Sequence, residues 1–304
     1  MRDDMVAEQQ ADPIPVSQAS DYLWTLCAPH GPIEVVDVGA NPIEGDPPYL
    51  SLLRSGRARV TGFEPQPEAL AALASRKSPA ETYLPHALGD GAPVTLHLYA
   101  HSGFASAFPV CRRNADLIGY ARGTRLTGTL ALDTVRLDDV DAVPSIDFLK
   151  IDVQGSELQI IANGAAKLGQ AVMVQTEVRL LPLYDHEPSF GELAGELARQ
   201  GFMFHDFAFL KRLPLRSRSQ KGLRPRAHRQ VLDGDAFFVR DLAQPERMSD
   251  AQLLRLALLA GEVAGSAGLA VWCLDQLSDR GAVAPDAAGR YMALLPDTLR
   301  RPDA

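Results

Sequence analysis

The sequence predicts an α/β fold, a sheet flanked by helices, with a small helical appendage at the C-terminal end. Short apolar runs of strand length alternate with segments whose apolar residues recur at helical spacing. Alternating strands and helices are typical of a parallel sheet. After Asp241 the sequence changes to leucine-rich segments with a helical pattern, which predict the appendage.

The order of the predicted elements divides the chain into three parts. We expect an N-terminal extension in residues 1–30, the α/β domain in residues 31–241 and the helical appendage in residues 245–304. The expected strands are 34–38, 60–64, 82–88, 94–99, 146–153, 172–177 and 236–239. The expected helices are 19–28, 67–75, 157–166 and 190–200, and Ser249 to Gln252 is typical of a capping box that starts a further helix.

Composition indicates an ordinary globular protein. The 304 residues are 46% hydrophobic and 22% charged, enough for one large domain plus the appendage. Three distant cysteines without a C-x-x-C pair indicate neither a disulfide framework nor a zinc site. No apolar segment is long enough to span a membrane. We therefore expect a cytoplasmic protein, and the apolar surface of the appendage is compatible with a homodimer.

The ends of the first two strands predict a nucleoside site. The run from Val35 to Val38 stops at Gly39, where a bare backbone allows a ligand to approach. The second strand ends in Glu64, 23 residues after Asn41. A carboxylate in that place can accept hydrogen bonds from both ribose hydroxyls. The structural alternative is that Gly39 only turns the strand and Glu64 is a solvated strand end.

The glycine pattern helps to choose among nucleoside cofactors. The loop after Gly39 lacks the G-x-G-x-x-G that cradles a pyrophosphate, and its acidic residues would repel one. The amino and sulfonium cations of S-adenosyl-L-methionine suit an acidic loop better. An NAD-dependent dehydrogenase or epimerase is therefore the weaker enzyme hypothesis. A non-catalytic S-adenosylmethionine-binding or scaffold module with a degenerate fold is the alternative outside enzymes.

Several motifs in a fixed order resemble the FkbM-type family of S-adenosylmethionine-dependent methyltransferases. They are Asp37-Val38-Gly39-Ala40-Asn41, Phe63-Glu64-Pro65, His86-Ala87-Leu88-Gly89-Asp90, the run from Asp147 to Glu157, and Thr176-Glu177-Val178. The resemblance covers about residues 33–241 and implies a Rossmann-like class I methyltransferase sheet. The chain departs from the family pattern at Ile43, where the family commonly has a glycine.

The resemblance implies O-methylation, with a sugar hydroxyl of a glycan or glycosylated metabolite as the expected acceptor. On this hypothesis Asp37, Gly39 and Asn41 line the methionine side of the cofactor. Glu64 holds the ribose, and Ala87 with Leu88 forms the adenine edge.

Two later strand ends carry the candidate catalytic residues, Asp152 and Glu177. Methyl transfer to a hydroxyl requires alignment of the acceptor and removal of its proton, which a carboxylate can do. Asp152 could instead fix a turn or touch only the cofactor, and we assign Glu157 to the first turn of a helix on dipole grounds.

Glu177 should face the acceptor with Arg179, Tyr184 and His186. No histidine has a spacing that identifies it as the base, and no cluster has metal-ligand spacing.

Two segments have open roles. Residues 99–143 interrupt the alternation with glycine-rich and aromatic pieces, as a substrate lid or as a surface insertion without a ligand role. Residues 211–229 carry eight basic residues and no acid, which leaves −16 on the rest of a chain whose net charge is −8. This basic segment could hold an anionic acceptor or be a solvated loop. It has no interleaved aromatics, so we expect no nucleic acid partner.

Overall fold

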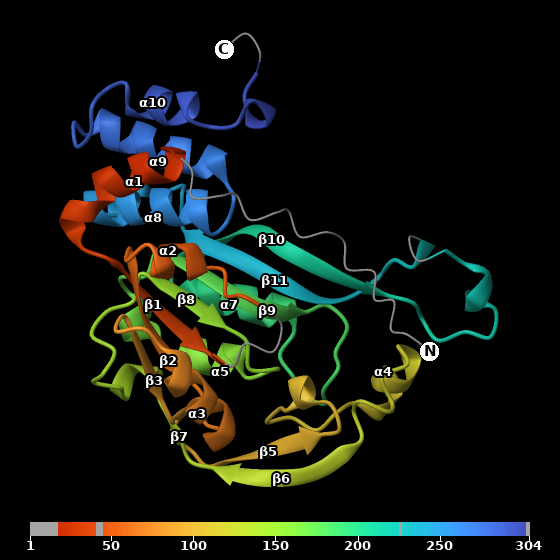
Figure 1. Ribbon diagram of the computed structural model, residues 1–304. Coiled ribbons are helices and arrows are strands. Elements are labelled where there is room, and N and C mark those ends of the chain that lie inside the picture. The colour runs from red at the N-terminus through yellow and green to blue at the C-terminus, as the bar shows by residue number, and fades with distance from the viewer. Residues whose placement is uncertain (1–17, 41–44, 225–226, 302–304) are drawn as a thin grey trace.

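The computed structural model describes residues 18–40, 45–224 and 227–301. Among these residues a central sheet has seven strands in the order β10-β11-β9-β8-β1-β2-β3 (Figure 1). Their bounds are β1 Ile33–Val38, β2 Ala58–Phe63, β3 Glu81–Leu84, β8 Phe148–Ile151, β9 Met173–Arg179, β10 Phe202–Leu213 and β11 Gln230–Arg240. The chain builds β1 to β3 outward and then returns to the other side of β1. The strand order therefore reverses between β1 and β8. Open α/β sheets bind ligands at such a topological switch point, beyond the carboxyl ends of the strands.

The sheet is mixed, whereas the alternation of elements predicts a parallel one. Strands β1, β2, β3, β8 and β9 pair in parallel, but β11 pairs antiparallel with both β9 and β10. Strand β10 was not predicted. It is an edge strand with three register shifts and mostly half-exposed side chains, so its sequence lacks the alternation of a regular strand.

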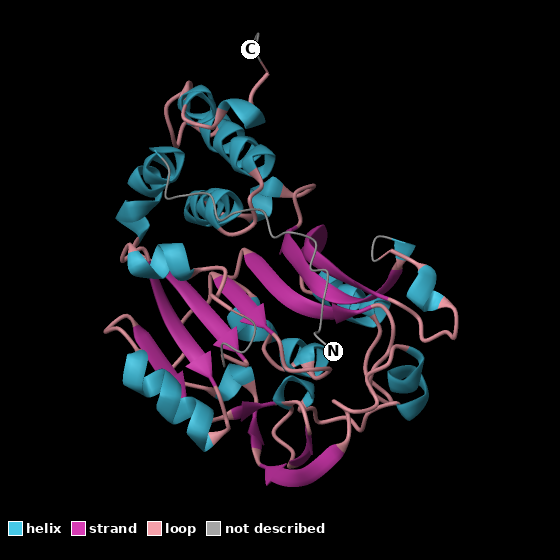
Figure 2. Cartoon of the chain, turned by 45° about the vertical axis from the view of Figure 1, so that its right-hand side comes forward, coloured by secondary structure: helices cyan, strands magenta, loops and turns pink. Residues whose placement is uncertain are grey.

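Alternate side chains of the strands pack on opposite faces of the sheet. Val35, Val60 and Met173 belong to one apolar cluster, with helix α1 (Gln18–Cys27), helix α2 (Leu50–Arg54) and the C-terminal helices. Val36, Leu149 and Val174 belong to a second cluster on the other face. The helices of that second cluster are α5 (Glu157–Ala162), α6 (Ala165–Leu168) and α7 (Phe190–Arg199). Figure 2 shows the sheet between these layers, and helix α3 (Pro67–Arg76) follows β2.

The C-terminal segment forms helices α8 (Asp250–Glu262), α9 (Ala267–Asp279) and α10 (Ala287–Ala293). The capping box predicted at Ser249 is confirmed, with both of its reciprocal hydrogen bonds present. These helices share one apolar cluster with the N-terminal helix α1, so the two ends of the described chain pack together. Arg255 of α8 pairs with buried Asp147 beside β8 and joins this layer to the sheet. No helix among the described residues is long and apolar enough to cross a membrane.

The interrupting segment lies on the carboxyl-end side of the sheet. Strand β5 (Val94–Tyr99) pairs antiparallel with β6 (Leu126–Leu132), and helix α4 (Arg112–Leu117) lies between them in sequence. The predicted strand 82–88 is two strands, β3 and β4 (Ala87–Leu88), because Pro85 has no N–H to continue the ladder. Strand β4 pairs with β7 (Thr134–Val135).

Candidate active site

The carboxyl ends of four parallel strands open into one cavity of about 2900 Å³. Its lining includes Asp37 and Gly39 after β1, Glu64 after β2, Asp152 after β8 and Glu177 in β9. Ala87 and Leu88 of β4 also line it, so the fold brings together every predicted site residue that it describes. Asn41 and Ile43 lie outside the described residues. The cavity exceeds the usual volume of a small-molecule site, about 300–1,000 Å³, so it has room for a cofactor and a second substrate.

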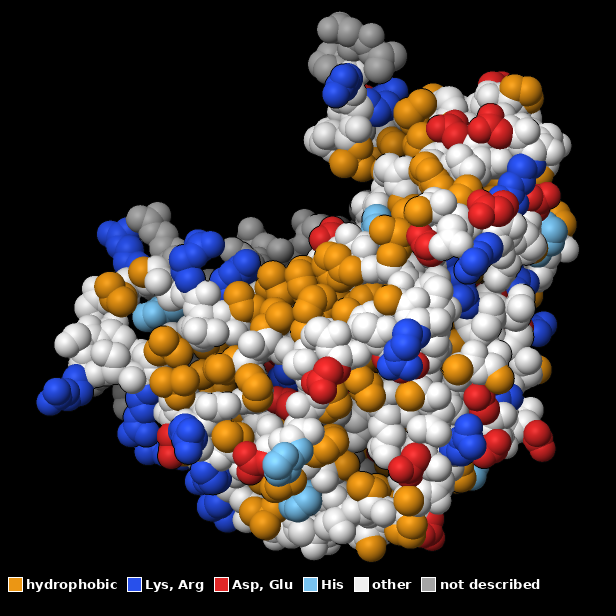
Figure 3. Space-filling view, turned by 180° about the vertical axis from the view of Figure 1, so that it is seen from behind, with side chains coloured by type: hydrophobic (Ala, Val, Ile, Leu, Met, Phe, Trp, Pro, Cys, Tyr) orange, Lys and Arg blue, Asp and Glu red, His pale blue; other side chains and the backbone are white. Residues whose placement is uncertain are grey.

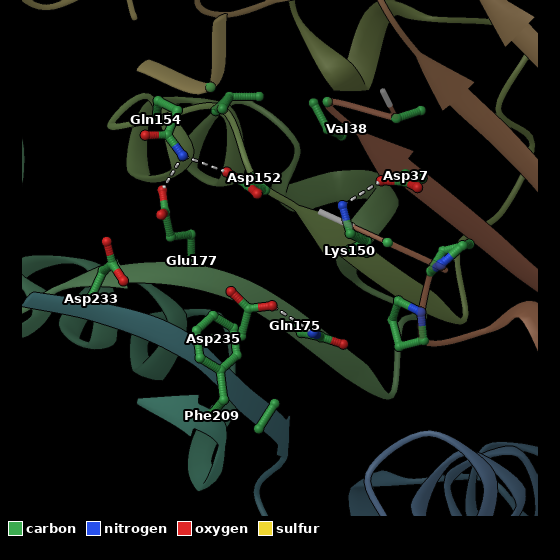
Figure 4. Close-up of a pocket in the computed structure, with 18 of the residues that line it drawn as sticks. Asp37, Val38, Lys150, Asp152, Gln154, Gln175, Glu177, Phe209, Asp233 and Asp235 are labelled. Atoms are coloured by element: carbon green, nitrogen blue, oxygen red, sulfur yellow. Dashed lines mark hydrogen bonds and ion pairs between the residues drawn. The ribbon is translucent and has the colours of Figure 1, made fainter. Parts of the chain in front are cut away.

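Asp37 is buried and is engaged by two protein groups. Lys150 Nζ lies 3.1 Å from its Oδ1, and the Tyr49 hydroxyl donates to its Oδ2 at 2.5 Å. Burial lowers the pKa of Lys150, but the carboxylates of Asp37, Asp152 and Asp235 together raise it by more, and the net result is a raised pKa. Lys150 pairs in register with Asp37 across β1 and β8, a contact that sequence reasoning missed. Figure 4 shows the pair on one side of the cavity.

Gly39 is required by the protein's own backbone. Its φ is +79°, and a Cβ added here would lie 2.0 Å from the carbonyl oxygen of Asp152. No side chain can be accommodated, because the obstacle is main chain that cannot move aside. The glycine therefore lets the ends of β1 and β8 pass close to each other.

Glu64 is only 3% exposed, so it is not a solvated strand end. Its Oε1 accepts the backbone N–H of Gln66 at 2.8 Å, and among the described residues its Oε2 has no hydrogen-bond donor. Burial raises the pKa of Glu64, and the Gln66 N–H lowers it by less. A buried carboxylate is costly unless it is hydrogen-bonded. A cavity-lining carboxylate with an unused oxygen fits a ligand that donates hydroxyls, such as a ribose.

Gln154 connects the two candidate catalytic carboxylates. Its Nε2 donates to Asp152 Oδ1 at 3.0 Å and to Glu177 Oε2 at 2.9 Å (Figure 4). Its Oε1 accepts from the Tyr184 hydroxyl and from Arg179. Gln154 has φ of +59°, an uncommon conformation for a residue with a side chain. Strained residues cluster at functional sites, and sequence reasoning missed this one.

Arg179 is surrounded by carboxylates. Its guanidinium pairs with Glu177, Glu187 and Asp233. Burial raises the pKa of Glu177 well above the usual range, and Arg179 only partly offsets this. The predicted grouping of Glu177 with Arg179 and Tyr184 is thus present in space, but Glu177 lines the cavity and Arg179, Tyr184 and His186 are not among its lining residues.

Glu157 supports the loop before its helix. Its Oε1 accepts the N–H of Val153 and its Oε2 accepts the N–H of Gly155, both at 2.9 Å. Burial raises the pKa of Glu157 to about 7. Its carboxylate shapes the turn that carries Asp152 and Gln154.

The fold assembles acidic residues that are separated in sequence. Ligand atoms of Asp152, Glu157 and Glu177 lie within 4.8 Å of one another, although the sequence spacing indicated no metal cluster. Gln154 and Arg179 already donate to this group. The Arg179 guanidinium pairs with Glu177 and so competes with a cation for this cluster, and we do not assign a metal to it.

The interrupting segment forms part of the cavity wall. Phe104, Tyr120 and Arg122 line the cavity, and the Ser106 hydroxyl donates to the Gln154 carbonyl oxygen at 2.6 Å. His101 lines it too, but its Nδ1 accepts the N–H of Gly103. The segment is therefore in contact with the loop that carries the candidate catalytic residues.

The strand order, with the strand-end carboxylates gathered at one cavity, defines a Rossmann-like domain with a ligand site at the carboxyl ends of its strands. The chain belongs to the methyltransferase FkbM domain family, whose sequence model matches residues 37–204. This membership is not compatible with the hypothesis of an NAD-dependent dehydrogenase or epimerase.

Individual proteins resemble the chain more distantly. The 2-O-methyltransferase NoeI of Sinorhizobium fredii is 26% identical over 160 residues, which cover 50% of this chain. The match spans 65% of the length of that curated relative. A solved magnesium protoporphyrin IX methyltransferase from Synechocystis PCC 6803 is 12% identical with a TM-score of 0.34, covering 73% of this chain and 77% of its own. A TehB-like methyltransferase from Corynebacterium glutamicum is 11% identical with a TM-score of 0.32, covering 72% and 87%.

Proposed function

We propose that this protein transfers the methyl group of S-adenosylmethionine to a hydroxyl oxygen of a sugar, in a glycan or a glycosylated metabolite. The observation that carries the proposal is the pair Asp152 and Glu177, held by Gln154 at the wall of the cavity. The name of the relative NoeI, a 2-O-methyltransferase, supports oxygen as the methylated atom.

The cofactor assignment divides the cavity by strand. Asp37 and Gly39, with Asn41, would line the methionine end, Glu64 would accept the ribose hydroxyls, and Ala87 with Leu88 would form the adenine edge. The Oε2 of Glu64, which has no donor among the residues that the structure describes, supports the ribose position. Because Lys150 compensates the charge of Asp37, we assign Asp37 an organising part at the methionine end. S-adenosylmethionine supplies an electrophilic methyl carbon on a sulfonium.

The chain's own task is to orient the acceptor hydroxyl and remove its proton. We assign that proton to Asp152 or Glu177, which share the Gln154 amide. Burial raises the pKa of Glu177, and a carboxylate with a raised pKa is a better proton acceptor near neutral pH. The wall formed by Phe104 and Tyr120 would exclude water from the acceptor.

Cationic side chains also line the cavity. Arg122 of the interrupting segment, with Arg216 and Arg229 of the basic segment, lines the same cavity. This supports an acceptor that carries negative charge, such as a phosphorylated or uronic-acid-bearing glycan. A homodimer through the C-terminal helices, for which gel filtration with light scattering is the test, belongs to the same proposal.

Methyl transfer from labelled S-adenosylmethionine to matched neutral and anionic glycans tests the proposal. Asp152→Asn or Glu177→Gln should lower kcat by about 10²- to 10⁴-fold, the usual contribution of a general base, while affinity for S-adenosylhomocysteine stays close to that of the parent. Asp275→Asn, an exposed change in α9, is the control and should leave turnover unchanged. Transfer to no glycan, with cofactor binding intact, would reject the proposed acceptor class.

A further inference from the structure

The connection between β10 and β11 extends beyond the edge of the sheet (Figure 1). We call residues 214–224 of this connection the basic arm. Its base is tied to the interrupting segment, because the Arg216 N–H donates to the Leu117 carbonyl oxygen at 2.6 Å. Arg216 lines the cavity, but Leu215, Arg218, Leu223 and Arg224 do not. The arm therefore has residues that the proposed methyl transfer leaves unexplained.

These four residues combine exposed apolar and exposed cationic side chains. Leu215 is 43% exposed and Leu223 is 56% exposed. Arg218 and Arg224 are exposed, and neither forms an ion pair with an acidic residue of the described chain. Figure 3 shows Lys and Arg side chains gathered on the side of the molecule that carries the arm, with hydrophobic side chains between them. The sequence from 211 to 229 contains no acid, although the whole chain is acidic.

The chemistry of the arm selects among anionic partners. A soluble anion would use the arginines but would leave the two leucines in water. Single-stranded nucleic acid would need stacking aromatics, and residues 211–229 contain none. The surface of an anionic bilayer uses both kinds of side chain, because headgroups attract arginine and the acyl boundary accepts leucine.

We propose that the basic arm docks on the surface of a bilayer that contains anionic lipids. Arg218 and Arg224 lie among the headgroups, and Leu215 and Leu223 enter the boundary with the acyl chains. Because Arg216 belongs both to the arm and to the cavity wall, docking places the cavity beside the membrane surface. An acceptor attached to a lipid would then be within reach. The docking itself does not depend on the proposed methyl transfer.

Vesicle co-sedimentation of the full chain tests the docking. The parent should bind vesicles of equal parts phosphatidylcholine and phosphatidylglycerol, and should bind phosphatidylcholine vesicles far more weakly. Arg218→Glu with Arg224→Glu should weaken binding by about 30-fold or more, since each basic residue near such a surface contributes about a factor of five and the introduced glutamates repel the headgroups. Arg247→Glu with Arg301→Glu makes the same charge change at exposed positions outside the arm and should change binding far less.

A second variant separates the bilayer from a soluble anion. Leu215→Ser with Leu223→Ser should also weaken binding to the anionic vesicles, while S-adenosylhomocysteine affinity and circular dichroism stay those of the parent. The proposal is overturned if the parent ignores anionic vesicles or if neither arm variant weakens binding. It is also overturned if the leucine variant binds like the parent and inorganic phosphate displaces the vesicles, since the arm would then be a site for soluble anions.

Discussion

Removing the carboxylate of Glu64 is the sharpest perturbation of the cofactor site. Glu64 is 3% exposed and uses one oxygen on the Gln66 N–H. If it accepts both ribose hydroxyls, Glu64→Ala removes two hydrogen bonds to a charged group, each contributing about 1.5–3 kcal/mol. Affinity for S-adenosylhomocysteine should therefore fall at least about 100-fold. Glu64→Gln, which keeps the shape of the side chain, should fall by less.

Calorimetric titration of the variants with S-adenosylhomocysteine measures this effect. Glu68→Ala is the matched control, since Glu68 is an exposed glutamate in the first turn of α3 and does not line the cavity. Circular dichroism checks that each variant is folded. Parent-like affinity in folded Glu64→Ala would refute the ribose assignment.

The same carboxylate makes a second prediction about the protein without ligand. Burial raises the pKa of Glu64, so the folded state disfavours its charged form and loses stability as pH rises through the carboxyl range. Glu64→Gln should then raise the melting temperature of the ligand-free protein at neutral pH. A lower melting temperature would show that the buried charge has protein partners that the geometry does not explain.

Three further changes test the architecture around the site. Gly39→Ala should destabilise the fold by about 3 kcal/mol or more, because its Cβ would meet main chain at 2.0 Å, whereas Gly195→Ala in α7, with open space around it, should be neutral or stabilising in chemical denaturation. Since burial raises the pKa of Glu157 to about 7, the folded protein keeps a proton that the unfolded chain releases, and stability should fall between pH 4.5 and about 7. In Glu157→Gln the melting temperature should depend less on pH over this range, and a pH dependence equal to that of the parent would contradict the assignment. Arg255→Ala should cost about 3 kcal/mol because it leaves a buried carboxylate unpaired, while Arg290→Ala at an exposed ion pair should cost less than about 1 kcal/mol.

Sequence patterns predicted the parts of the fold that follow a regular period. The strands around Asp37, Glu64 and Asp152 are buried runs that end at polar residues, so their existence and their common edge could be inferred. Strand β10 could not, because an irregular edge strand pairs on one side only and tolerates half-exposed side chains. Because β10 was not predicted, the antiparallel pairing of β11 with β9 and β10 was not predicted either.

Candidate site residues could be predicted where the local sequence around one residue shows that it follows a strand. A carboxylate that follows a strand pattern can be placed at the carboxyl end of the sheet from the sequence alone, and Glu64 and Glu177 line the cavity there. Contacts between distant segments gave no signal in one sequence. Lys150 contacts Asp37 through the pairing of β1 with β8. Gln154 donates to two carboxylates from a left-handed backbone conformation that its sequence does not indicate.

Titration of the parent protein with S-adenosylhomocysteine, alongside NAD, tests the central claim most directly. The account predicts saturable binding of S-adenosylhomocysteine at one molecule per chain and no binding of NAD. Saturable binding of NAD, or of neither ligand by the folded protein, would contradict the assignment of the strand-end cavity to S-adenosylmethionine.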